Sequence, residues 1–406
     1  MSNLVVLFLT VPLVTAFVGY ITNWAAVKMI FHPHGFVGVG PLGWQGIIPR
    51  LAPKFATDIA TTLTENGLLT VDEIVDQLDP DELEGVLRVV VAEQAPALAR
   101  DVAEAVQPGL WAELAEPVQQ MVADQLSQQT MRAGRDTFDR LRARSAELLD
   151  IEGLVFELLT GENTDRLSRL TQEIGAKEFR FIVAYGGVFG LLIGLVQAAL
   201  FQILGVWWFM PIIGVFVGLI TNWLAIQMIF RPVHPRRFFG LVTYQGLFPK
   251  RQAEISADYG RLAGEEIFTP AHLIGALSQG EAGTAIALEV TSTVSTTVED
   301  LWPMVTAMLP QGVEDPEVLE RVKATVALRL LSTLPTVQPQ LEAYMARKLT
   351  IGDLIESKLA ALPKERFERI LRGVFEEDEI TLILIGGVLG GLVGLLQGFI
   401  VLAVGL

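Results

Sequence analysis

Four side-chain amides lie at repeated positions in segments without a single charged residue: Asn23, Gln197, Asn222 and Gln397. Such an amide must find a hydrogen-bond partner, because burying it unpaired is costly. In a membrane it either bonds a neighbouring helix or lines a path for a polar solute. We expect the asparagines to hold structure, by bonding each other or by capping the segment that follows. The glutamines are the second candidates for a functional polar pair.

The asparagines belong to a motif that occurs twice. GYITNWAAVKMIFHP at 19–33 and GLITNWLAIQMIFRP at 218–232 are identical at ten of fifteen positions, and each precedes a Q-G-x-x-P segment ending in a base. Tryptophan is typical of a membrane–water interface, and the glycines after each copy predict a loop or short hairpin there. The shared residues are Asn23, Trp24, Pro33, Gln45, Gly46 and Pro49, and Asn222, Trp223, Pro232, Gln245, Gly246 and Pro249.

Residue types for catalysis or metal binding are scarce. The chain has no cysteine, and neither HExxH nor GxSxG occurs. When the two copies are aligned on the repeated motif, His32 corresponds to Arg231 and His34 to Val233, so the histidines do not align. No charged residue lies in mid-span, which argues against an ion pump. We therefore expect no enzyme, no cofactor and no metal.

Long charge-free segments must position these residues. Hydrophobic residues make up 51% of the chain, and no Asp, Glu, Lys or Arg occurs at 1–27, 181–230 or 380–406. Because a helix of about 20 apolar residues crosses a bilayer, these segments predict four spans. The first is expected to be a span rather than a cleaved signal peptide, since no basic residue precedes it. The expected spans are 4–24, 182–203, 207–227 and 380–404, with a hinge near Gly205.

Glycines recur four residues apart in the second and fourth spans. This spacing lets helices approach closely, so each of these spans is expected to pack tightly against the other or against another span. The surrounding sequences, YGGVFGLLIGLVQ at 185–197 and IGGVLGGLVGLLQ at 385–397, repeat as well. The glycines are Gly186, Gly190, Gly194, Gly386, Gly390 and Gly394.

Together the repeats predict an all-α integral membrane protein, a tandem duplication of span, helical block and span. Thr70 with Glu73 and Asp79 with Pro80 are typical helix starts within the blocks. Lys and Arg flank the block ends of the spans, which predicts cytoplasmic blocks and outside termini in a bacterial inner membrane. The expected segments are 1–31 (first span and exit motif), 32–180 (first block), 181–230 (second and third spans), 231–379 (second block) and 380–406 (fourth span).

The motifs G-x-I-T-N-W-x-A-x-x-M-x-F-x-P, Q-G-x-x-P-[KR] and G-G-V-x-G-x-x-x-G-L-x-Q resemble those of the bacterial YheB-like membrane proteins of domain-of-unknown-function family 445. The likeness covers nearly the whole chain and implies a membrane protein, without an activity to transfer. Lys28 is replaced by Gln227 and His32 by Arg231 in the second copy, so no single base there is required in both.

Two functions fit these observations. The first is a non-enzymatic membrane scaffold or lipid-handling element, with membrane lipids as partners, self-association as an option and no nucleic acid. The alternative is an oligomeric channel or transporter for a small solute, lined by the four amides.

Overall fold

The computed structural model describes residues 2–39, 42–204, 206–238, 242–308, 315–376 and 379–404. Helices and two short β-hairpins make up the fold, which divides into two compact units. The first unit comprises Met1–Leu68, Val155–Leu262 and Gly352–Leu406, and the second comprises Leu69–Leu154 and Ala263–Ile351. Each unit therefore takes segments from both halves of the chain.

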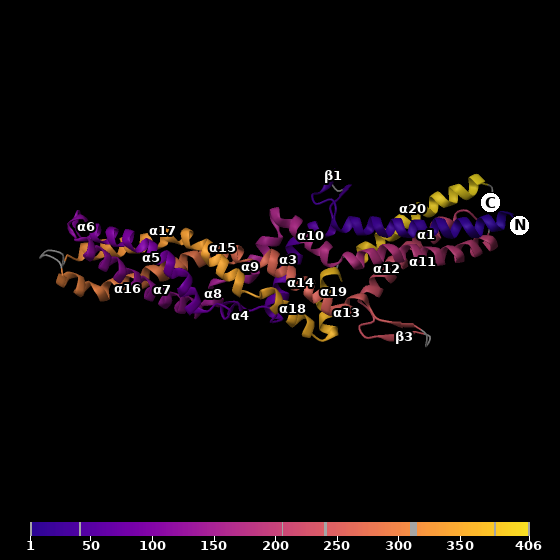
Figure 1. Ribbon diagram of the computed structural model, residues 1–406. Coiled ribbons are helices and arrows are strands. Elements are labelled where there is room, and N and C mark those ends of the chain that lie inside the picture. The colour runs from indigo at the N-terminus through magenta and orange to yellow at the C-terminus, as the bar shows by residue number, and fades with distance from the viewer. Residues whose placement is uncertain are drawn as a thin grey trace. The chain divides into compact units, whose positions relative to one another are not determined.

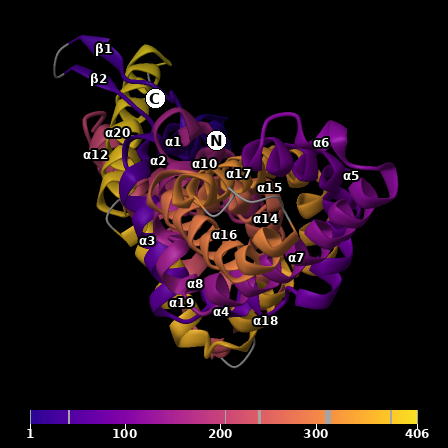
Figure 2. The ribbon, with the colours of Figure 1, turned by 90° about the vertical axis from the view of Figure 1, so that its left-hand side faces the viewer.

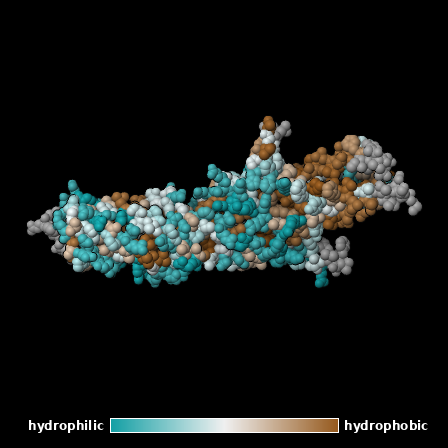
Figure 3. Space-filling view, turned by 45° about the horizontal axis from the view of Figure 1, so that its top comes forward, coloured by the Kyte–Doolittle hydropathy of each residue, from teal (hydrophilic) through white to brown (hydrophobic). Residues whose placement is uncertain are grey.

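The first unit contains four helices that are long and apolar enough to cross a membrane, as predicted. They are α1 (Ser2–Phe31), α11 (Ala176–Leu204), α12 (Phe209–Phe230) and α20 (Glu379–Val404). Helix α1 continues through Pro12 and past Trp24 to Phe31, because the residues after Trp24 are apolar apart from Lys28. The predicted hinge residue Gly205 lies outside the described residues. The space-filling view shows the spans as a hydrophobic surface (Figure 3).

The spans pack in two pairs, α1 with α11 and α12 with α20 (Figure 1). Each glycine ridge faces the first span of its own half, one of the arrangements that the sequence left open. A Cβ atom at Gly190 would lie 2.5 Å from the Thr15 carbonyl oxygen, and one at Gly390 would lie 2.2 Å from the Gly214 carbonyl oxygen. Only glycine therefore fits without a shift of one backbone against the other.

A short hairpin follows the first span of each half, as the glycine-rich segments predicted. In the first, β1 (Val37–Val39) pairs with β2 (Leu42–Trp44), and in the second, β3 (Arg236–Phe238) pairs with β4 (Val242–Tyr244), both antiparallel. The remaining helices of this unit lie beyond the hairpins: α2 (Ile47–Arg50), α3 (Ala52–Glu65), α9 (Ile151–Leu159), η1 (Gly161–Asn163), α10 (Thr164–Ile174), α13 (Leu247–Lys250), α14 (Gln252–Leu262), α18 (Ile351–Ala361) and α19 (Lys364–Glu376).

The second unit is a helical bundle. Its long helices are α5 (Pro80–Val106), α7 (Glu116–Arg142), α16 (Gly280–Met308) and α17 (Pro316–Lys348), seen from one end in Figure 2. Helix α5 contacts α7 and α17, and α16 contacts the same two helices, so the four form a closed ring. The shorter helices are α4 (Val71–Val75), α6 (Leu110–Glu113), α8 (Ser145–Leu148), η2 (Ala263–Ile267) and α15 (Pro270–Ser278).

The helix starts of this unit follow the sequence signals. Thr70 and Glu73 form a capping box at the start of α4, and the Asp79 carboxylate accepts a hydrogen bond from the Asp81 backbone N–H at the start of α5. These bonds satisfy backbone donors that have no partner within the helix. Leu98, Val294 and Val326 belong to the buried apolar cluster of the bundle.

Candidate functional site

The two repeated asparagines bond backbone carbonyls across the helix pairs. Asn23 Nδ2 donates to the Ile182 carbonyl at 2.8 Å, and Asn222 Nδ2 donates to the Leu382 carbonyl at 2.8 Å. Neither the other asparagine nor a following segment is the partner, so both of the predicted pairings are wrong. The amides instead connect the first and last spans of each half. Their own Oδ1 atoms are buried without a hydrogen-bond partner.

The two glutamines meet at a residue that the sequence did not single out. Thr15 Oγ1 lies 3.1 Å from Gln197 Oε1, and Gln397 Nε2 donates to the same hydroxyl at 3.3 Å. Gln197 Nε2 also donates to Met210 Sδ at 2.9 Å. Comparison of the repeats does not mark Thr15, because its counterpart in the second copy is Gly214. The glutamine amides are therefore bonded to protein groups within the bundle of spans.

The repeated tryptophans project from the helix pairs. Trp24 and Trp223 are each 49% exposed, and Lys28 Nζ lies 5.2 Å from the centre of the Trp24 ring. Such a cation–ring contact is favourable where a span approaches the aqueous phase. Both rings lie about two helical turns before the end of their helix, so each helix continues further than the sequence predicted.

The first junction (residues 31–39 and 42–51) comprises the end of the first span, its hairpin and α2, and backbone contacts fix it. Gln45 Nε2 donates to the His34 carbonyl at 2.8 Å, and the Gly46 N–H donates to the Pro33 carbonyl at 2.9 Å. A Cβ atom at Gly46 would lie 2.7 Å from the Phe31 carbonyl carbon, so only glycine permits this approach. Pro49 is buried in the helix that follows.

The second junction (residues 230–238 and 242–251) repeats these contacts. Gln245 Nε2 donates to the Val233 carbonyl at 2.7 Å, and the Gly246 N–H donates to the Pro232 carbonyl at 2.9 Å. A Cβ atom at Gly246 would lie 2.7 Å from the Phe230 carbonyl carbon, and Pro249 is buried. In both copies, therefore, the glutamine side chain and the glycine N–H bond carbonyls in the segment that begins with the first proline of the motif.

His34 and His234 occupy equivalent positions in the two junctions, although alignment on the motif paired His34 with Val233. His34 Nδ1 is hydrogen-bonded to Asp165 Oδ1, and His234 Nε2 is hydrogen-bonded to Glu365 Oε1. One additional residue after Pro232 shifts the second copy. The offset of 200 that relates Gln45 to Gln245 also relates these histidines, and was the signal that could have aligned them.

No metal site forms around these histidines. Within the described residues, no group of three His, Cys, Asp or Glu side chains is placed to hold a metal ion.

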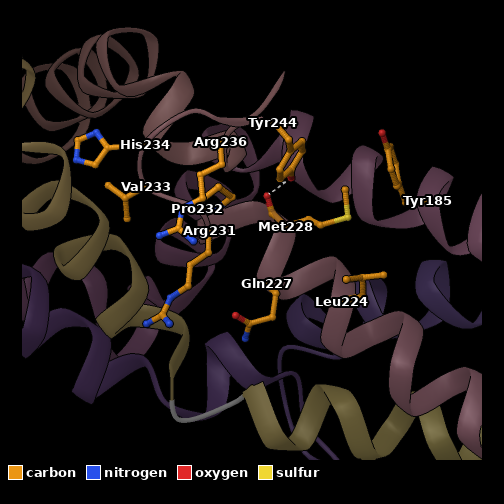
Figure 4. Close-up of a pocket in the computed structure, with 10 residues that line it drawn as sticks. All are labelled: Tyr185, Leu224, Gln227, Met228, Arg231, Pro232, Val233, His234, Arg236 and Tyr244. Carbon is orange, nitrogen blue, oxygen red and sulfur yellow. Dashed lines mark hydrogen bonds between the residues drawn. The ribbon is translucent and has the colours of Figure 1, made fainter. Parts of the chain in front are cut away.

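An open pocket of about 940 Å³ lies at the second junction (Figure 4). Leu224 and Met228 of α12 and Tyr185 of α11 give it an apolar side at the end of the spans. Arg231 and Arg236 lie just beyond the end of α12 and give it two positive charges. The other lining residues are Gln227, Pro232, Val233, His234 and Tyr244.

Neither Arg231 nor Arg236 forms an ion pair with the residues that the structure describes. The Tyr244 phenol donates to the Met228 carbonyl, and burial and the neighbouring Tyr185 raise the pKa of Tyr244 to about 12, so it stays neutral (Figure 4). A pocket with apolar walls and unpaired guanidinium groups can hold an amphiphilic anion.

Comparison with known proteins confirms the resemblance that the motifs indicated. A family described as "Protein of unknown function (DUF445)" matches residues 13–139. A UPF0754 membrane protein of Bacillus velezensis is 41% identical over 70 residues, which is 17% of this chain and 19% of the relative. The UPF0754 membrane protein YheB of Bacillus subtilis is 39% identical over 70 residues, with the same coverage of both chains.

A third relative, a UPF0754 membrane protein of Bacillus pumilus, is 45% identical over 64 residues, 15% of this chain and 17% of its own length. The matched part of the chain thus spans less than a fifth of each of these relatives. They are bacterial proteins named as membrane proteins, in agreement with four apolar helices. No solved structure matches the chain.

Proposed function

We propose that the protein is a non-enzymatic membrane protein that handles lipids, and that the second junction binds the headgroup of an anionic phospholipid. The observation that supports this proposal is the pocket at the end of α12, which joins an apolar side to two arginines that form no ion pair among the described residues. A phospholipid has the same division, because its charged phosphate lies directly above its acyl chains.

The position of the pocket along the span fits such a ligand. Helix α12 ends at Phe230, so Arg231 is the first residue beyond the apolar segment. Leu224 and Met228 lie within that segment, on its side of Arg231. Arginine binds phosphate through paired N–H groups, which gives geometric selectivity in addition to charge attraction.

Native mass spectrometry in mild detergent tests this site, with phosphatidylglycerol and phosphatidylcholine as probes. An arginine near an anionic lipid contributes about 1 kcal/mol, so replacing both Arg231 and Arg236 by Gln should weaken retention of phosphatidylglycerol roughly thirtyfold. Retention of phosphatidylcholine should change little.

Arg237→Gln is the matched control for this experiment. Arg237 carries the same charge on the same strand but does not line the pocket, since neighbouring strand residues point to opposite faces. Equal retention of phosphatidylglycerol by wild type, the double variant and Arg237→Gln would contradict the proposal.

A scaffold role is compatible with lipid handling, whereas the channel or transporter has weaker support. Asn23 and Asn222 donate to backbone carbonyls, and Gln197 bonds Thr15 and Met210. Amides engaged in this way hold helices together and would have to lose these bonds to line a solute path. Solute flux in proteoliposomes that Asn23→Leu abolishes without loss of stability would favour the conduit.

The proposal also covers the tandem duplication of the chain and its orientation in the membrane. We propose a tandem duplication, supported by the equivalent bonds of Asn23 and Asn222 in the two helix pairs. The Lys and Arg residues near the spans support cytoplasmic blocks and outside termini. Because the chain has no cysteine, Ser2→Cys should react with an impermeant thiol reagent in intact cells, and Gln120→Cys should not. The opposite pattern would reverse the orientation.

A further inference from the structure

We infer that the bundle of the second unit binds a single alkyl chain of a lipid, in a cavity of about 320 Å³ between α5, α7, α16 and α17. This volume lies within the range of about 300–1,000 Å³ that small-molecule pockets occupy. The inference deepens the proposed function and rests on it for the source of the lipid. It concerns a site separate from the arginine pocket.

The cavity is long. It is lined over twelve residues of α5, from Pro80 to Val91, and over twelve residues of α7, from Thr130 to Leu141, which is eleven helical steps in each. At 1.5 Å per residue, both helices border it for about 16 Å. The closed ring of the four helices bounds this space on several sides, which gives it the form of a slot rather than a flat surface.

The walls of the cavity are mostly apolar. They consist mainly of leucine, valine, isoleucine, phenylalanine and methionine side chains. Three of the four lining threonine hydroxyls bond their own helices: Thr137 donates to the Ala133 carbonyl at 2.8 Å, Thr293 to the Glu289 carbonyl at 2.9 Å and Thr333 to the Arg329 carbonyl at 2.8 Å. A cavity with mostly apolar walls, whose threonine hydroxyls are largely bonded, favours an apolar occupant.

The charges at the cavity indicate the kind of lipid. Arg135 is paired with Asp81 at 2.8 Å and with Glu84 at 3.4 Å, so two carboxylates face one guanidinium. An anionic group would have to compete with these carboxylates. The site therefore suits the chain of an uncharged or zwitterionic lipid, in contrast to the arginine pocket of the first unit.

Photo-crosslinking of the full chain in phosphatidylcholine nanodiscs tests the inference. The probe is a phosphatidylcholine that carries a diazirine in the middle of one acyl chain, and labelled peptides are identified by mass spectrometry. We expect label on α7 and α17 of the wild type. Gly134→Phe should reduce this label at least tenfold while leaving label on the four spans unchanged.

Gly134 and Gly85 form a matched pair for this experiment. Both lie within long helices and a Cβ atom at either meets no atom within 4 Å, but only Gly134 lines the cavity. Gly85→Phe should therefore label like the wild type. Val290→Trp on α16 fills the cavity from the opposite side and replaces Gly134→Phe if that variant does not fold.

Undiminished cavity label in Gly134→Phe and Val290→Trp, or wild-type label confined to the four spans, would overturn the inference. The variant with Arg231→Gln and Arg236→Gln distinguishes a failure of the cavity inference from a failure of the proposed function. Cavity label in that variant together with lost selectivity for phosphatidylglycerol supports both sites. Cavity label without any phosphatidylglycerol selectivity in the wild type would leave the cavity standing and refute the arginine pocket.

Discussion

The two junctions share their backbone contacts and differ in their side chains. In each, a glutamine and a glycine bond carbonyls that follow the end of a span, and a histidine holds a carboxylate. Arg231, Arg236 and Arg251 of the second junction stand where the first has His32, Phe36 and Leu51. The shared contacts set the direction in which the chain leaves the membrane, and the added arginines give one junction a charge that the other lacks.

The largest expected effect breaks an ion pair that only the second junction has. Arg251 is paired with Glu178, which is 1% exposed. Arg251→Met leaves that carboxylate buried without its partner, so we expect a loss of about 3–5 kcal/mol in the free energy of unfolding, measured by denaturation in detergent.

The variant with both Arg251→Met and Glu178→Met is the control for this pair. It removes both charges and should recover most of the loss, because no unpaired charge remains. A double variant as unstable as Arg251→Met would show that the contribution of Arg251 is not electrostatic.

The glycine ridges should respond alike in the two halves. Gly190→Ala and Gly390→Ala each place a Cβ atom against the backbone of the facing span, at 2.5 Å and 2.2 Å from carbonyl oxygens. We expect each to cost about 1–3 kcal/mol, seen as a lower melting temperature in detergent. Gly187→Ala is the control, since its Cβ atom would meet its nearest neighbour at 3.6 Å. Equal melting of all three variants would disprove the close packing.

Replacing the repeated asparagines should lower stability by a smaller amount. Asn23→Ala and Asn222→Ala each remove one hydrogen bond to a neighbouring helix, so each should cost roughly 0.6–2 kcal/mol of stability. Because the two amides bond different carbonyls, the losses should add in the double variant. A double-mutant cycle with a substantial coupling energy would mean that the asparagines interact after all.

The histidines should give the smallest effect. Their side chains are 38% and 65% exposed, so solvent screens both ion pairs. His34→Gln and His234→Gln should therefore each shift the melting temperature in detergent only slightly. A large shift at either junction would assign that histidine a structural role beyond the ion pair.

The Glu365 carboxylate makes the stability of the fold depend on pH. Its pKa is lowered by a hydrogen bond to its own backbone N–H and then by His234. A lowered folded-state pKa stabilises the fold above the ordinary carboxyl pKa, and this contribution is lost as the pH falls through the lowered value. Glu365→Gln should therefore lower stability near neutral pH, with a difference from wild type that shrinks on acidification.

The sequence by itself determined the membrane part of the fold. Charge-free length sets how many helices can span a bilayer, and this property is local, so four spans follow from composition alone. The helix starts at Thr70 and Asp79 and the hairpins after α1 and α12 are also local, because a few neighbouring residues form them.

Only the tertiary structure decided which of these elements meet. A glycine ridge fits any closely approaching helix, so spacing did not say that Gly190 faces Thr15. A buried amide can form a hydrogen bond with any donor or acceptor within reach. The sequence therefore could not predict the carbonyl partners of Asn23 and Asn222, or that two glutamines contact Thr15. The arginine pocket joins α11, α12 and a hairpin, and the cavity joins four helices from both halves. Such sites depend on contacts between distant residues, which the packing of whole helices fixes and the order of residues along the chain does not.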